Sequence, residues 1–145
     1  MDGEPSMRLV TLLLLGTALA AADATGARAE TPSCYGKQQP KQVAELLFGR
    51  DVGGKVAVSE SAWARLVAQQ ITPRFPDGLT VTDAAGQWRD PSTGAIVREP
   101  SKRVEIVLPG NADDEAQLDA VVGAYKQKFH QRSVGIIVRT ACVAF

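Results

Sequence analysis

The chain has 145 residues, with 16 basic and 16 acidic side chains and no formal net charge. A chain of this length is typical of one domain. A neutral chain has no global electrostatic field to attract nucleic acid or an anionic membrane surface, so composition excludes the strongly basic nucleic-acid-binding class.

Residues 1–29 have the pattern of a cleaved signal peptide. Arg8 precedes the apolar run LVTLLLLGTALAAA, which is short for a membrane span and is followed by small residues. Cleavage is expected after Ala29, with cleavage after Ala24 or an uncleaved anchor as alternatives. Removing residues 1–29 takes away three acidic and two basic residues, which leaves a net charge of +1. The sequence therefore predicts a periplasmic or secreted protein without stable membrane association after cleavage.

Both cysteines lie after the predicted cleavage site. Residues 30–42 are polar and are expected to form a leader held by Cys34, ahead of a single domain over residues 43–145. An even pair of cysteines at the two ends of an exported chain predicts a disulfide between Cys34 and Cys142, with two free thiols as the alternative. Two distant cysteines and one histidine do not have the spacing of a zinc site. No metal and no cofactor is predicted.

The first half of the domain reads as a strand, a helix and a second strand. Residues 43–49 are expected to form the first strand. Ser59 is the expected N-cap of a helix that Pro73 ends, and its apolar residues recur at helical spacing: Trp63, Leu66, Val67 and Ile71. Alternation of apolar and polar residues in GLTVTDA then predicts a half-buried strand.

The second half is expected to contain a hairpin, a strand, a helix and a last strand. Asp90-Pro-Ser-Thr-Gly94 is a turn sequence between two short strand segments. Residues 102–108 alternate and predict a further strand. The second helix begins near residue 111 and carries apolar residues on one face through Phe129. The run SVGIIVRTACVAF is long and strongly apolar and predicts the last strand.

This order of elements is typical of an α+β fold, the ferredoxin-like plait (βαββαβ), here with an inserted β-hairpin. Both helices are expected on one face of an antiparallel sheet. The other face is expected to carry polar residues of mixed sign that pair across strands: Glu45, Thr80, Thr82, Arg103, Glu105 and Arg139. A homodimer packed through this open sheet face, or the hairpin folded over it, are the alternatives to a solvated face.

Several motifs resemble those of a known family. They are ELLFGR, VSESAW, ITPRFPDGLTV, GQWR, REPSK, YKQKFHQRSV and the terminal ACVAF, and they cover nearly all of the expected domain. The family is a group of small secreted bacterial proteins catalogued only as a domain of unknown function. The resemblance implies a secreted location, and it implies no chemistry.

The segment TPRFPDG, residues 72–78, has both a structural and a functional interpretation. Its prolines stop the helix and its Asp77-Gly78 pair supplies a turn into the next strand. Arg74 is not explained by those roles. Its guanidinium is expected either to bind the protein's own helix-end carbonyls, Asp77 or Glu99, or to hold an anionic ligand.

Further polar and aromatic residues are candidates for the same site. Together with Arg74 and Asp77, the ligand-binding candidates are Trp88, Arg89, Lys102, Tyr125 and Lys126, and His130 is expected to be a surface residue at a helix end. The sequence lacks recognisable catalytic motifs. The first hypothesis is therefore a non-enzymatic exported binding or accessory protein for a small anionic ligand. The second is a small enzyme acting on an anionic or aromatic molecule, with Arg74 and Arg89 holding the anion and Glu99 transferring a proton.

Overall fold

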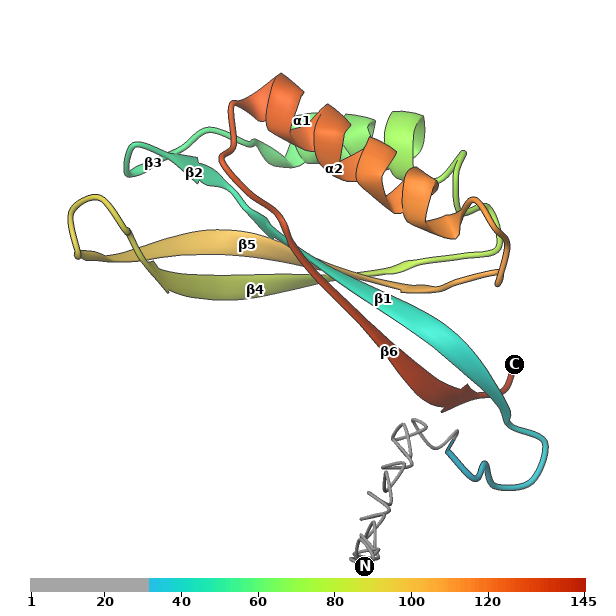
Figure 1. Ribbon diagram of the computed structural model, residues 1–145. Coiled ribbons are helices and arrows are strands. Elements are labelled where there is room, and N and C mark those ends of the chain that lie inside the picture. Colours follow the sequence, from blue (N-terminus) through green and yellow to red (C-terminus); the bar gives the residue numbers. More distant parts are fainter. Residues whose placement is uncertain (1–31) are drawn as a thin grey trace, which may run out of the picture.

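The computed structural model describes residues 32–145, and the signal peptide predicted over residues 1–29 lies outside the described residues. The fold is α+β, with two helices and a four-stranded antiparallel sheet in the order β4-β5-β1-β6 (Figure 1). The elements in chain order are β1 (Gln39–Gly49), β2 (Asp51–Val52), β3 (Lys55–Val56), α1 (Glu60–Leu66), the π-helical turn η1 (Val67–Ile71), β4 (Thr80–Arg89), β5 (Ile96–Val107), α2 (Asp114–Phe129) and β6 (Gly135–Val143).

Both helices cover the same face of the sheet, as expected (Figure 1). Alternate residues of β1 and β5 point into this layer, and they are fully buried because the apolar stripes of α1 and α2 pack on them. The centre of the core is aromatic. The ring of Phe48 lies 5.1 Å from that of Trp63 and 4.7 Å from that of Tyr125, both in edge-on geometry, which is a favoured arrangement of aromatic side chains.

The opposite face of the sheet carries the predicted cross-strand ion pairs. Arg103 donates to Glu45 over 2.8 Å, and Arg139 donates to Glu105 over 3.1 Å. Glu45 and Glu105 are directly opposite each other in the register of β1 and β5. Without the two arginines, their carboxylates would repel each other. We refer to Glu45, Arg103, Glu105 and Arg139 as the ion-paired quartet.

The structure differs from expectation at two strands. The predicted inserted hairpin is not a separate unit, because β4 and β5 pair without interruption from Thr80 opposite Glu105 to Arg89 opposite Ile96. Gly86 lies within β4. β1 begins at Gln39 rather than at residue 43, since residues 39–42 pair with the end of β6. These four residues therefore belong to the sheet and not to the leader.

The predicted disulfide is confirmed. Cys34 and Cys142 are bonded, and 108 positions separate them in the sequence. The bond joins the segment before β1 to the end of β6, next to the pairing of Pro40 with Cys142. Within residues 32–145, no helix has the length and apolar character that a membrane crossing requires.

Candidate functional site

The two arginines proposed as an anion clamp lie at opposite ends of β4. Arg74 precedes the strand and donates from Nη1 to the carbonyl oxygen of Gln70 over 2.7 Å and to its side-chain oxygen over 3.1 Å. Arg89 ends the strand and donates to the carbonyl oxygen of Gly94 over 2.9 Å. A strand of ten residues spans roughly 30 Å, so one small anion cannot contact both guanidinium groups. Arg74 therefore binds a carbonyl oxygen at the end of the helix, which is one of the roles expected for it.

Lys102 is buried on the helix side of β5 and is engaged with the protein's own carboxylates. Its ammonium group donates to Glu60 over 2.8 Å and to Asp83. Glu60 also accepts from Arg50 over 2.5 Å. The hydrogen bonds to Asp83 and Glu60 raise the pKa of Lys102, and the bond from Lys102 is the main cause that lowers the pKa of each carboxyl group. This network joins α1 to β4 and β5.

The network predicts a loss of stability in acid. A carboxyl group with a lowered pKa contributes stability that is present above its unfolded pKa, here 4.5 for Glu60 and 3.8 for Asp83, and that is lost as pH falls through the folded value. The raised pKa of Lys102 places its own loss of stability above pH 10.5. Lys102→Met should therefore flatten the decline of Tm below about pH 4.5, measured by circular dichroism. Lys126→Met, at an exposed lysine of α2, is the control and should keep the wild-type slope. An unchanged slope in Lys102→Met would contradict the assignment.

The other candidates lie apart from these residues. Tyr125 is buried in the core, donates its hydroxyl hydrogen to the carbonyl oxygen of Gly49 over 2.6 Å, and has a raised pKa because burial disfavours the phenolate. Asp77 lies in the loop before β4, and Lys126 lies in the last turn of α2. His130 is the C-cap of α2 in the left-handed conformation. Tyr125 therefore binds the last residue of β1. A different group of polar residues meets at this end of the strand.

Glu99 is the centre of that group. Its Oε1 accepts from the indole Nε1–H of Trp88 over 3.0 Å, and its Oε2 accepts from the backbone N–H of Asp51 over 3.0 Å. Trp88 comes from β4, Glu99 from β5, and Asp51 from β2 directly after β1. Both donors offer only an N–H, so both carboxyl oxygens act as acceptors. Three strands thus fix one carboxylate in position.

Two glycines leave the room for this arrangement. A Cβ atom at Gly49 would lie 2.5 Å from Oε1 of Glu99, and a Cβ atom at Gly86 would lie 2.6 Å from Oγ of Ser101. Gly86 is the register partner of Glu99. A glycine inside a strand often marks such a close approach. We call Gly49, Asp51, Gly86, Trp88 and Glu99 the Glu99 site.

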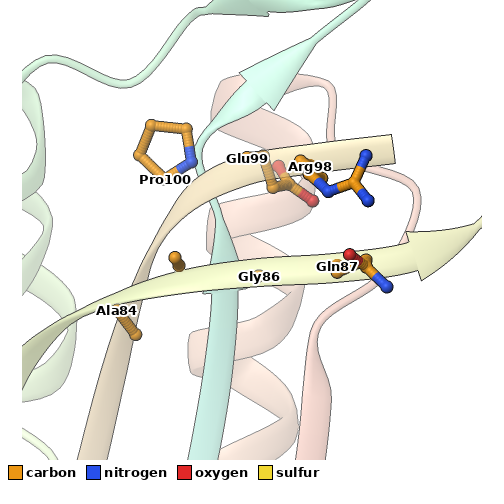
Figure 2. A pocket seen from close by; sticks show the side chains of 7 residues that line it. Ala84, Gly86, Gln87, Arg98, Glu99 and Pro100 are labelled. Atoms are coloured by element: carbon orange, nitrogen blue, oxygen red, sulfur yellow. The ribbon is translucent and has the colours of Figure 1, made fainter. Parts of the chain in front are cut away.

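An open hollow of about 550 Å³ adjoins the Glu99 site. Figure 2 shows how it extends from Ala84 and Pro100, past Gly86 and Glu99, to Gln87 and Arg98. Its floor is made of small residues, whereas its far end carries an amide and a guanidinium. The indole of Trp88 at the edge of the site is 39% exposed. Glu99 and Arg98 both line the hollow, and Trp88, which donates to Glu99, lies next to it.

Sequence comparison identifies a family of unknown function, as the motifs indicated. The model of the family described as Protein of unknown function (DUF3574) matches residues 43–145. The chain belongs to the DUF3574 family. Membership confirms the resemblance that the motifs carry, and it assigns no activity to this DUF3574 protein. Among curated proteins, none matches the sequence.

Solved structures resemble the DUF3574 protein in fold. A phage SAM lyase in complex with S-methyl-5′-thioadenosine has 18% sequence identity and a TM-score of 0.57, over 79% of this chain and 97% of that chain. The apo state of the phage SAM lyase has 20% identity and a TM-score of 0.53, over 73% and 92%. CutA from Synechococcus elongatus has 16% identity and a TM-score of 0.45, over 71% and 78%. At these identities the likeness shows the fold alone.

The sequence signals for the Glu99 site in this DUF3574 protein were present but weak. Trp88 and Glu99 were candidates, but with Arg74 and Arg89 as their partners. Gly49 and Gly86 were not candidates, although a glycine inside a strand, such as Gly86, can signal a close backbone approach. The backbone N–H of Asp51 carries no sequence signal at all, because every residue except proline has one.

Proposed function

We propose that this DUF3574 protein is an exported, non-enzymatic binding protein that holds a small heteroaromatic molecule at the Glu99 site. The observation that carries the proposal is the carboxylate of Glu99, which is held by Trp88 and Asp51 beside an open hollow. Such a preformed polar group at a concave surface is typical of ligand sites.

The chemistry of the site defines the ligand class. Each carboxylate oxygen has a further lone pair, so Glu99 can accept hydrogen bonds from an amino group on the ligand. The exposed part of Trp88 offers a face or edge for an aromatic ring. Arg98 in the hollow offers a cation to an anionic substituent. The ligand is therefore a flat ring with an amino donor and an optional anionic group.

Binding rather than catalysis fits the openness of this site. Trp88 is substantially exposed and the hollow is formed by two strands without a covering element among residues 32–145. Catalytic sites gain much of their electrostatic strength by excluding water. Turnover of a bound ligand would instead favour the alternative, an enzyme in which Glu99 transfers the proton.

The fold and the disulfide support the remaining parts of the proposal. We infer a ferredoxin-like plait, and this inference is supported by the strand order β4-β5-β1-β6 and by the two helices on one face. The phage SAM lyase of similar fold holds S-methyl-5′-thioadenosine, which has a flat ring with an amino group. The disulfide between Cys34 and Cys142 is compatible with an oxidising compartment such as the periplasm.

Calorimetric titration with S-methyl-5′-thioadenosine tests the proposal. The wild-type protein should bind this probe, and Glu99→Gln should bind it at least about tenfold more weakly, because a charge-assisted hydrogen bond is lost. Glu105→Gln changes a carboxylate on the same strand and sheet face but within the ion-paired quartet, and it should bind like the wild type.

Two results would contradict the proposal. One is the absence of heat with the wild-type protein, and the other is equal affinity in the wild type and Glu99→Gln. If Glu99→Gln lowers Tm strongly but leaves the affinity unchanged, Glu99 only pins β5 to β4 and to the end of β1. Thermal melting of each variant separates this outcome from a loss of binding.

A further inference from the structure

β6 is an edge strand with the composition of an interior strand. It pairs only with β1, at the end of the order β4-β5-β1-β6 (Figure 1). Three consecutive apolar residues on it are each nearly half exposed: Ile136 at 41%, Ile137 at 46% and Val138 at 50%. None of the other elements within residues 32–145 pairs with the outer edge of β6.

These side chains are apolar on both faces of the sheet. Ile136 pairs with Leu46 and therefore points to the helix side, whereas Ile137 pairs with Glu45 and points to the opposite side. A strand that is apolar on both faces is normally flanked by strands and covered by other layers. The sequence of β6 is thus typical of an interior strand, whereas the strand lies at the edge of the sheet.

β6 also lacks the features that protect edge strands from pairing. It contains no proline, and its register with β1 is unbroken over nine residue pairs, so it has no bulge. Its one charged residue, Arg139, is engaged with Glu45 of β1 and Glu105 of β5. The other edge strand, β4, carries Asp83 and Arg89 and several other polar residues. Charges, prolines and bulges are the usual means by which edges avoid association. The charges of β4 are engaged as well, Asp83 with Lys102 and Arg89 with Gly94, so β4 differs from β6 in its more polar composition.

We propose that β6 pairs with β6 of a second copy of this chain, antiparallel about a two-fold axis. The second copy is the fitting occupant because the edge of an antiparallel strand is complementary to itself under such an axis. The exposed Ile136, Ile137 and Val138 of each protomer then cover those of its partner. The two four-stranded sheets become one continuous sheet.

This interface differs from the homodimer through the open sheet face. The centre of that face is occupied by the ion-paired quartet, whose charges already satisfy one another. Burying them against a second copy would remove their solvation without a new partner. The edge of β6 instead offers unpaired backbone groups and apolar side chains together, so the second copy joins at the edge and leaves the face open.

Sedimentation of the full, disulfide-bonded chain over a concentration series tests this proposal. The wild type should reach the mass of a dimer. The double variant Ile136→Lys/Val138→Lys places cations on the helix side of β6 and should weaken the dimer at least about tenfold, because like charges meet across the axis. Val56→Lys alters a similarly exposed apolar residue on β3 and should leave the dimer unchanged.

A variant on β1 separates the edge from the face. Leu47→Lys alters an exposed residue of the open face, one strand inside the edge, and should leave the dimer intact. Dissociation by Leu47→Lys with persistence in the double variant would place the interface on the face and overturn the proposal. A monomeric wild type at every concentration would do the same. Ile137→Lys, checked by its circular dichroism spectrum, is the second edge variant should the double variant not fold.

Discussion

Replacing both Cys34 and Cys142 with serine is expected to lower the free energy of unfolding by about 4–5 kcal/mol. The disulfide closes a loop of 108 positions, and the loss of conformational freedom that such a long loop imposes on the unfolded chain has about this value in the chain-entropy model. Tm should fall by roughly 15–25 °C. Urea unfolding of the double variant beside the oxidised wild type measures the difference.

The effect should be concentrated at one end of the sheet in the folded state. Pairing between Gln39–Gln42 and Thr140–Val143 lies next to the disulfide, so amide hydrogen exchange should quicken there first. Ala141→Ser, beside Cys142 in the same strand, is the control and should stay within about 1 kcal/mol of the wild type. A double variant with wild-type stability would show that the bond does not constrain the unfolded chain.

Phe48→Ala is expected to cost about 3–5 kcal/mol, the usual range for removing a buried aromatic side chain. Phe48 is fully buried and contacts the rings of Trp63 and Tyr125 edge-on. Its removal leaves a cavity that neither ring can fill without losing its own packing, and Tyr125 also holds the carbonyl of Gly49. Denaturant unfolding gives the value directly.

The neighbouring residue provides a matched control for Phe48. Leu47 precedes it in β1 but points to the open face and is 40% exposed, so Leu47→Ala should cost less than about 1.5 kcal/mol. Similar losses in the two variants would mean that the alternation of β1 has been assigned to the wrong faces.

The sequence predicted most of the secondary structure because its signals are local. Ser59 caps α1 as expected, since its hydroxyl accepts from the backbone N–H of Ala62. Alternation in β5 placed Val104 and Ile106 in the core and Arg103 on the other face. The disulfide followed from cysteine number and compartment.

Features that depend on which strands pair could not be predicted from local sequence patterns. Gly86 was not singled out in the sequence, but in the structure it leaves room for Ser101 and Glu99 of the neighbouring strand. The continuity of β4 then carries Arg89 far from Arg74, which no local pattern determines. The position of β6 at the edge follows from topology, and its apolar sequence alone suggests an interior strand.

Binding at the Glu99 site is tested most directly by the indole N–H resonances of the two tryptophans in a nuclear magnetic resonance titration with S-methyl-5′-thioadenosine. Trp88 donates its indole hydrogen to Glu99, whereas Trp63 is buried in the core, and a Trp63→Phe variant assigns the two signals. We expect the Trp88 signal to shift saturably as the probe is added, the Trp63 signal to stay, and the shift to be lost in Glu99→Gln. A Trp88 signal that does not move at saturating probe would contradict ligand binding at this site.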